Sequence, residues 1–467
     1  MKRIDVLPDD VLLGIFDFYV NMSQSYRRGR RGTDIEVWQS LVHVCRLWRG
    51  LVLGSPLRLN LHLFCTPQTP AKDTLDVWPA LPLLVAGKMT LSSGTDNVIA
   101  ALKQSNRVCK VDLSLASWQL EEVLAAMQVP FPELTNLQLI LRGETLPVIP
   151  VPDSLLGGSA PRLRYVKLSG VPFPGLPNLL LSANHLVFIW LSNIPHSGYI
   201  SPGAIVALIS VLSSLRTLTL RFRSPQSRPD WQSRSLPPPK RCILPALNKF
   251  HFKGVTEYLE ELVTHIVTPQ LGEMHITFFN QIDFDCPRLA QFIDCTPTLR
   301  VFDEARVQSN DSTVRVNLRC RTSQPGFNRD YLRIHISCRE PDWQLSSIEQ
   351  ICNSSLHPLS TVEDLYIDHR YRFLVWKNDA IENTLWLQLL LSFTTVKNLY
   401  LSRTFAPGIA AALQGLVRGG ITEVLPRLQN IFVEGLEPSG PFETNIGQFV
   451  AARRLSGHPI AISDWDK

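Results

Sequence analysis

Few side-chain groupings in the sequence could carry chemistry. The closest to a metal-ligand set is the stretch Gln281–Pro287, in which Asp283, Asp285 and Cys286 stand within four residues. Carboxylates suit a hard cation such as Ca²⁺ or Mg²⁺, but such ions take six to eight oxygen ligands, and no further ligand run accompanies these residues. Carboxylates that cap a loop are the simpler interpretation, so we expect no bound metal.

Patterns of common catalytic sites are also missing. The sequence has no glycine-rich phosphate loop, no Gly-x-Ser-x-Gly elbow, no His-Glu-x-x-His pair and no kinase-type series. Eleven histidines are scattered, and His251 and His275 fall at variable positions of predicted strands, where a solvated surface histidine is the default interpretation. We expect a protein that is not an enzyme and that needs no cofactor.

Composition indicates a folded chain. Of 467 residues, 45% are hydrophobic and 19% are charged, which is enough apolar material for a substantial core. The net charge of +5 is small for this length and argues against a nucleic-acid partner, because phosphate contacts normally require a clustered basic face. The run Arg27-Arg28-Gly-Arg30-Arg31 is better explained as part of a solvated loop.

The cysteines and the apolar runs bear on the compartment. Nine cysteines form an odd, widely scattered set with no Cys-x-x-Cys pair, which favours reduced thiols. Acidic residues interrupt the N-terminus where a secretory signal would be apolar, and no apolar run reaches the roughly 18 residues of a membrane span. These features predict an intracellular protein, cytoplasmic or nuclear, without a membrane partner.

Two short amphipathic helices are predicted near the N-terminus. In the first, Val11, Leu12, Ile15 and Phe16 recur at helical spacing, while Pro8 and the acids after it suit a helix start. The second carries an apolar stripe formed by Trp38, Leu41, Val44, Cys45 and Trp48. Helices this short cannot build a core of their own, so we expect their apolar surface to be buried elsewhere.

These residues resemble the F-box, a small helical motif that docks onto the Skp-family adaptor of cullin-based ubiquitin ligases. The resemblance rests on Leu7-Pro8, on the apolar pairs after it, and on the stretch from Leu41 to Arg49. The segment Ser55–Leu61 is similar to the segment that comes directly after the motif in fungal F-box proteins with leucine-rich repeats. The resemblance implies that the adaptor, and through it a cullin, is bound by Leu7, Pro8, Val11, Leu12, Ile15, Phe16, Leu41, Val44, Cys45 and Trp48.

Downstream, one apolar pattern returns along the chain. Each copy of the pattern has three apolar residues, with two variable residues between the first and second and one variable residue between the second and third. Examples are Val108/Val111/Leu113 and Leu163/Val166/Leu168. Repeat starts lie between 23 (163 to 186) and 32 (215 to 247) residues apart, a loosely kept leucine-rich-repeat period. Several return segments should be helical: 203–212, 256–263, 383–390 and 406–417.

The predicted fold class is therefore α/β: a short helical F-box followed by a curved leucine-rich-repeat-like solenoid. A stack of ordinary small α/β units is the alternative. The expected boundaries are a helical motif at 1–54 with an insert at 21–34, a linker and N-terminal cap at 55–107, the array at 108–448 and a C-terminal cap at 449–467. Two stretches interrupt the array: a Pro- and Ser-rich mobile loop at 223–241, and paired strands within 314–337.

Strand residues between the inward leucines are the positions that a partner would meet. Aromatic and arginine side chains are the usual anchors of protein interfaces. The resulting candidates for target binding are Trp190, Arg221, His251, Tyr366 and Tyr400. The leading hypothesis is a substrate-recognition subunit of an SCF-type ubiquitin ligase that holds a target protein, and the alternatives are a repeat scaffold without a ligase role and a nucleic-acid binder.

Overall fold

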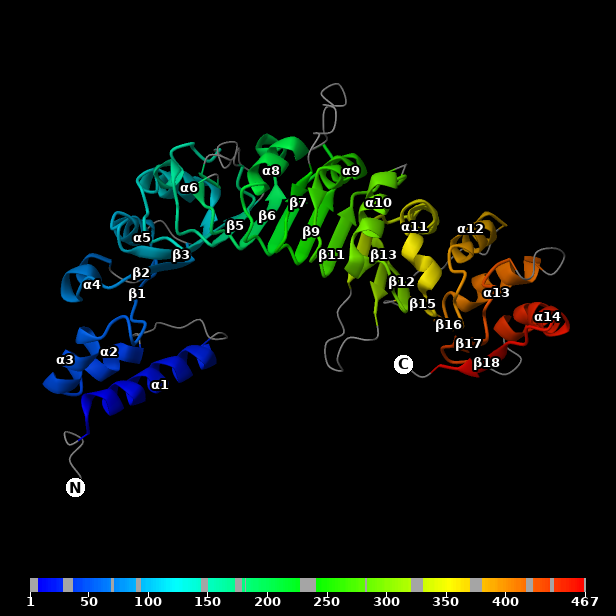
Figure 1. Ribbon diagram of the computed structural model, residues 1–467, viewed down its shortest axis with the longest axis horizontal. Coiled ribbons are helices and arrows are strands. Elements are labelled where there is room, and N and C mark those ends of the chain that lie inside the picture. The colour runs from blue at the N-terminus through cyan, green and yellow to red at the C-terminus, as the bar shows by residue number, and fades with distance from the viewer. Residues whose placement is uncertain are drawn as a thin grey trace. The chain divides into compact units, whose positions relative to one another are not determined.

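A computed structural model describes residues 7–27, 37–68, 71–89, 94–143, 150–172, 179–180, 182–226, 241–281, 284–320, 331–369, 380–416, 423–436 and 441–465. The chain divides into two compact units, Met1–Leu186 and Val187–Lys467, here called the N-terminal and C-terminal units. Both are built from strands that alternate with helices or irregular return segments (Figure 1). The predicted α/β class is therefore confirmed.

Three helices open the N-terminal unit: α1 (Asp9–Arg27), α2 (Val37–Val42) and α3 (Arg46–Gly54). Helix α1 starts where the sequence predicts it, with two acids in its first turn at the positive end of the helix dipole. It continues to Arg27 and so takes in the first half of the 21–34 insert. An established helix extends at little cost through polar residues, because only its first turn is hard to form.

A parallel sheet forms the rest of this unit. Its strands follow chain order: β1 (Leu63–Cys65), β2 (Leu83–Lys88), β3 (Val108–Ala116), β4 (Asn136–Arg142) and β5 (Tyr165–Ser169). Helices α4 (Ala71–Val77), α5 (Thr95–Leu102) and α6 (Ser117–Ala126) and the 3-10 turn η3 (Leu155–Gly158) make the returns. Strands β1 and β2 lie inside the segment 55–107 that we expected to be linker and cap, so the sheet begins earlier than the predicted array. Prolines around these short strands obscure their alternation in the sequence.

The C-terminal unit contains the longer sheet. From β6 (Phe188–Ile194) it runs through β7 (Thr217–Phe222), β9 (Lys249–Gly254) and β11 (Glu273–Phe278), all parallel. It ends with the parallel strands β15 (Asp364–His369), β16 (Asn398–Leu401), β17 (Asn430–Val433) and β18 (Ala461–Asp464). Strand β18 falls in the expected C-terminal cap, where it continues the sheet by one more strand. Beside the main sheet, β8 (Cys242–Ile243) pairs with β10 (Ile266–Val267).

An antiparallel insertion stands in the middle of this sheet. Strands β14 (Leu332–Ser337), β13 (Thr313–Arg319) and β12 (Glu304–Asn310) pair antiparallel to each other, while β14 joins β11 and β12 joins β15 in parallel. The paired strands predicted within 314–337 are thereby confirmed. Chain direction reverses twice across the insertion, so the parallel repeat resumes unchanged at β15.

Helices cover one face of the C-terminal sheet. They are α8 (Pro202–Ile209), α9 (Thr256–Thr264), α10 (Pro287–Cys295), α11 (Pro341–Ser355), α12 (Ala380–Leu391), α13 (Ala406–Gly415) and α14 (Pro441–Leu455), and each packs against the next (Figure 1). Short 3-10 turns η4 (His196–Gly198), η6 (Pro297–Leu299) and η7 (His357–Thr361) complete the returns. The helices predicted in the four return segments are confirmed as α8, α9, α12 and α13.

Burial alternates along the strands because successive side chains point to opposite faces of a sheet. In β9, Phe250 and Phe252 are buried toward the helices, whereas Lys249, His251 and Lys253 are partly exposed on the other face. The same alternation in β11 and β14 defines two sides of the C-terminal sheet: a helix-covered face, and an open face lined by polar and aromatic side chains.

Candidate functional site

The first candidate surface is formed by the N-terminal helices. Their inner side is a small core, so the expectation that helices this short cannot build one was wrong. Leu12 and Phe16 of α1 are buried, as is Leu41 of α2. The ring of Phe16 packs against that of Trp48 in α3, with ring centroids 4.7 Å apart and a tilt of 60°. Helix α1 contacts both α2 and α3, so this core lies between the three helices.

The outer side of α1 is also apolar. Val11 is 46% exposed, Ile15 49% and Phe18 65%, and these three residues are spaced to form one stripe along the helix. Val44 and Leu47, at and after the α2–α3 turn, are exposed as well. Seven of the nineteen large apolar side chains that are exposed among the described residues lie between Leu7 and Leu47. Apolar surface concentrated in this way is typical of an interaction site.

The residues implied in adaptor binding fall into two groups. Leu7, Pro8, Val11, Ile15, Val44 and Cys45 are exposed, whereas Leu12, Phe16 and Leu41 are buried and Trp48 is partly exposed against Phe16. Cys45 begins α3, where its sulfur accepts a hydrogen bond from the backbone N–H of Trp48 at 3.5 Å. The buried members can therefore shape the surface, while only the exposed members are available to a partner in this conformation.

Specific contacts attach the helices to the segment that leads into the sheet. The indole Nε1 of Trp38 donates to the backbone oxygen of His62 at 3.0 Å, and the Trp38 ring meets that of Trp78 edge-on at 5.1 Å. Arg58 Nη1 lies 2.8 Å from Asp10 Oδ1 at the start of α1. These contacts leave the stripe of Val11, Ile15 and Phe18 uncovered.

The second candidate surface is the open face of the C-terminal unit. One row of side chains crosses it in strand register, and we call it the open-face row: Trp190, Thr219, His251, His275, Arg333, Asn317, Arg306, Tyr366, Tyr400 and Phe432. Of the residues predicted to bind a target, Trp190, His251, Tyr366 and Tyr400 lie in this row. Arg221 is exposed on β7, two residues beyond the row.

An aromatic ladder forms one part of the open-face row. Tyr366 stacks on Tyr400 at 4.2 Å between ring centroids, and Tyr400 stacks on Phe432 at 4.6 Å. Trp465 lies across the first two rings, at 5.8 Å and 5.5 Å. The Arg306 guanidinium lies 4.7 Å from the centre of the Tyr366 ring, a cation–π distance. This ladder is preordered, so a partner that met it would not have to fix these side chains on binding.

A histidine cluster forms the other part. The rings of His251 and His275 stack in parallel, 4.5 Å apart, and Trp190 meets His251 edge-on at 6.1 Å. Glu273 lies beside both histidines, and its Oε2 is 2.6 Å from Lys249 Nζ. Among the described residues, the trio His251, Glu273 and His275 is a group whose donor atoms could converge on a metal ion.

Burial and charge shift the pKa values in this cluster. Partial burial lowers the pKa of His251, and it outweighs the neighbouring Glu273 carboxylate, which acts in the opposite direction. Burial acts to raise the pKa of Glu273, but the Lys249 hydrogen bond, the Lys249 charge and the imidazoles in their protonated form lower it overall. Near neutral pH these shifts favour an ionised Glu273 beside an uncharged His251.

Sequence reasoning missed several residues of this face. Strand register places Glu273, Arg306 and Phe432 beside the predicted residues, and Trp465 follows β18 directly. Phe432 could have been found from the sequence, since it stands at the same repeat position as Tyr366 and Tyr400. Trp465 carried no such signal, because it falls in the stretch expected to be a C-terminal cap and follows no repeat triplet.

Some sequence predictions lie wholly or partly outside the described residues. These include Asp283 of the Asp283–Asp285–Cys286 set, most of the basic run from Arg27 to Arg31, and positions 227–240 of the loop expected at 223–241. Cys286 itself is buried and precedes α10. No described helix is both long enough and apolar enough to cross a membrane.

Comparisons with known proteins add little to this picture. No family model matches the chain, and no curated protein matches it either. Among solved structures, the chain is similar to a leucine-rich repeat-containing protein, LegL7, from Legionella pneumophila, with 13% sequence identity and a TM-score of 0.29. That match covers 83% of this chain and 97% of the other. Function is therefore inferred from the two surfaces described above.

Proposed function

We propose that this chain is the substrate-recognition subunit of an SCF-type ubiquitin ligase, in which the N-terminal helices dock a Skp-family adaptor and the open face holds a target protein. The observation that best supports this proposal is the exposed stripe of Val11, Ile15 and Phe18 on α1, because the opposite side of that helix is already buried in a core. A helix that served only to close the end of a repeat array would need one apolar face. Helix α1 has two.

The F-box resemblance supports the same surface from the sequence. Val11 and Ile15 of α1, and Leu7 before it, carry that resemblance and are exposed. Val44, in the α2–α3 turn, belongs to the same motif and is exposed as well. Val11 and Ile15 are each about half exposed, so burying the rest of each side chain is favourable by about 1 kcal/mol, roughly half the value for a fully exposed one.

In this proposal the chain acts through proximity and catalyses nothing itself. A target bound on the C-terminal unit would be tethered to the cullin assembly through the adaptor. Tethering raises the effective concentration of the target near the ubiquitin-charged enzyme, so transfer becomes effectively intramolecular. The preordered aromatic ladder supports target binding on the open face, because rigid aromatic side chains are typical interface anchors.

The test is binding of the purified chain to a Skp-family adaptor, with the double variant Val11→Lys/Ile15→Lys beside it. Both side chains are exposed, so the variant should fold, whereas two lysines on the stripe would place charge in an apolar interface. Loss of a hot-spot pair costs about 2 kcal/mol or more, roughly thirtyfold in affinity. The matched control is Leu57→Lys, since Leu57 is 92% exposed and lies outside the stripe.

The outcomes separate the proposal from its alternative, a repeat scaffold without a ligase role. Docking through the stripe predicts that the native chain and Leu57→Lys bind equally and that the double variant binds at least thirtyfold more weakly. If the folded native chain does not bind the adaptor, the scaffold takes the place of the proposal. The contacts of Trp38 with His62 and Trp78 would then represent the main role of these helices, which is to cover the first strand.

A further inference from the structure

The histidine cluster on the open face has a geometry that neither adaptor docking nor target binding explains. Strands β9 and β11 are parallel neighbours, and their register places His251 beside His275 and Lys249 beside Glu273. All four side chains are on the open face, since the residues between them are buried toward the helices. The sheet itself therefore holds two imidazoles and one carboxylate side by side.

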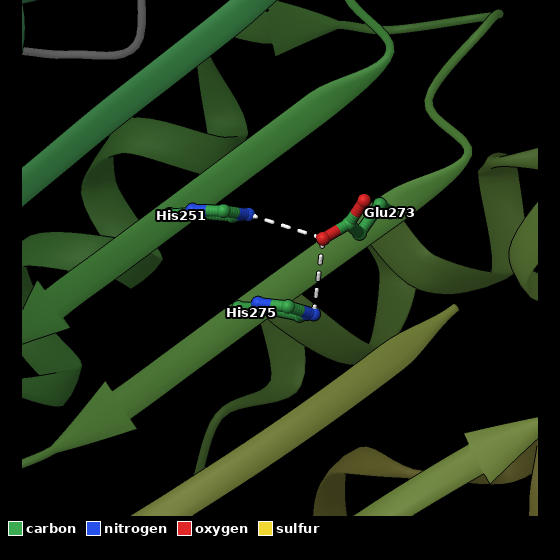
Figure 2. A group of neighbouring side chains, drawn as sticks. All are labelled: His251, Glu273 and His275. Atoms are coloured by element: carbon green, nitrogen blue, oxygen red, sulfur yellow. Dashed lines mark hydrogen bonds and ion pairs between the residues drawn. The ribbon is translucent and has the colours of Figure 1, made fainter. Parts of the chain in front are cut away.

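One carboxylate oxygen faces both imidazoles. Glu273 Oε1 is 3.4 Å from His251 Nε2 and 3.3 Å from His275 Nε2, and the ligand atoms of the three residues all lie within 4.8 Å of one another (Figure 2). In a tetrahedral zinc site, ligand atoms about 2.0 to 2.1 Å from the ion lie roughly 3.4 Å from each other. The two nitrogen–oxygen distances therefore already match edges of such a tetrahedron.

Neighbouring groups favour the ligand forms of these residues. Lys249 Nζ forms an ion pair with the other carboxylate oxygen, Oε2, at 2.6 Å. This contact orients Glu273 so that Oε1 faces the histidines. Outer partners of this kind commonly orient metal ligands. Metal ligands bind in their deprotonated forms, so protons and the ion compete for the two imidazoles.

We propose that His251, Glu273 and His275 form a binding site for a single Zn²⁺ ion on the open face, with a fourth coordination position open to solvent or to a bound partner. Two imidazoles and one carboxylate make a common ligand set for zinc sites that keep an open position. The parallel rings, 4.5 Å apart, must tilt toward each other so that both Nε2 lone pairs point at one ion. This site is independent of the adaptor contact and extends the proposed function.

The competing explanation is a plain hydrogen-bonded cluster, in which a protonated histidine bridges to Glu273. The two explanations differ in their response to the metal alone. A hydrogen-bonded cluster has no specific affinity for Zn²⁺, whereas a metal site binds one ion per chain. Its affinity should fall as the pH is lowered, because protons compete for the imidazoles.

The experiment is a titration of the full chain with Zn²⁺, read by competition with a chromophoric chelator. Exposed thiols, including those of Cys45 and Cys295, are first alkylated so that they do not bind the ion. The variants are His251→Gln, His275→Gln and Glu273→Gln, which remove a ligand while keeping a polar side chain. His196→Gln is the matched control, since His196 is an exposed histidine of the same unit and is not part of the cluster.

The proposal predicts one zinc ion per chain. The zinc affinity should be at least about tenfold weaker in each ligand variant, since loss of a residue that only supports a metal ligand usually has an effect of that size. The affinity of His196→Gln should be unchanged. Substituting Co²⁺ should give the visible absorption of a tetrahedral nitrogen and oxygen site in the native chain and not in His275→Gln. The proposal is overturned if the folded native chain binds no stoichiometric zinc, or if the ligand variants bind as tightly as the control.

Discussion

Truncation of Phe252 should loosen the C-terminal sheet around β9, because the two faces of this strand differ in what they bury. Phe252 is only 2% exposed. Its ring lies 5.7 Å from that of Tyr258 in α9 and 6.4 Å from that of Phe222 in β7. The substitution Phe252→Ala removes a ring that contacts another strand and a helix. The Tyr258 hydroxyl donates to the Ile200 backbone oxygen at 2.8 Å, and this bond holds α9 in place, so the helix cannot move to fill the cavity.

The expected cost is about 3 to 5 kcal/mol, the usual range for a buried phenylalanine replaced by alanine. A chain of this length need not unfold in one step, so the effect is best read locally, by hydrogen exchange of the amides in β7, β9 and α9. Each 1.4 kcal/mol is a factor of ten in an equilibrium constant. Amides that exchange through opening of this region should therefore exchange roughly a hundredfold to several thousandfold faster.

Phe188→Ala is the matched control, because it is the same substitution on the open face. Phe188 is partly exposed and stacks on Trp190 at 6.1 Å between ring centroids. We expect it to cost about 1 kcal/mol, the scale of an aromatic pair at a surface. Equal acceleration of exchange in both variants would refute the assignment of a buried and an open face to this sheet.

Two further predictions concern ionisable side chains that the fold buries wholly or partly. Arg453 of α14 is fully buried and donates from Nη2 to the backbone oxygens of Leu425, Pro426 and Leu428. The substitution Arg453→Met leaves these acceptors without their donor, so it should lower stability by about 1 to 3 kcal/mol. Faster hydrogen exchange of the amides in β17 and α14 would show the loss. Burial lowers the pKa of His62, His251 and His265 from 6.5, so the unfolded chain takes up protons before the folded chain as the pH falls. The stabilising contribution of these neutral histidines should be fully present above about pH 6.5 and should decrease toward pH 5. The decrease should appear as a lower melting temperature. His251→Gln should remove part of that decrease, and an unchanged pH dependence in this variant would contradict the shift assigned to His251.

The sequence predicts the repeat architecture well because the inward positions are nearly all apolar. Triplets such as Leu163, Val166 and Leu168 repeat at intervals that no single helix or hairpin would produce, and all three are buried. The first strand of the N-terminal unit, which begins at Leu63, and the last strand of the C-terminal unit, which ends at Asp464, were harder to find. Terminal strands are short and bury less, so their apolar alternation is weaker than in the middle of the array.

The candidate surfaces were only partly predictable for a different reason. Which residues of the first helix are apolar can be read from the sequence, but which of them the protein itself buries depends on where α2 and α3 pack. Phe16 and Val11 are equally apolar in the sequence, yet only Val11 remains exposed. The histidine cluster was hidden because His251 and Glu273 are neighbours only through strand register, which the variable repeat length conceals.

The central claim is that the exposed stripe of α1 docks a Skp-family adaptor, and calorimetric titration of the full chain with that adaptor tests it most directly. Docking through the stripe predicts a one-to-one complex whose binding enthalpy becomes more negative as temperature rises, because burial of apolar surface gives a negative heat-capacity change. Absence of binding by the folded chain would contradict it. So would binding with no heat-capacity change, since the stripe of Val11, Ile15 and Phe18 would then lie outside the contact.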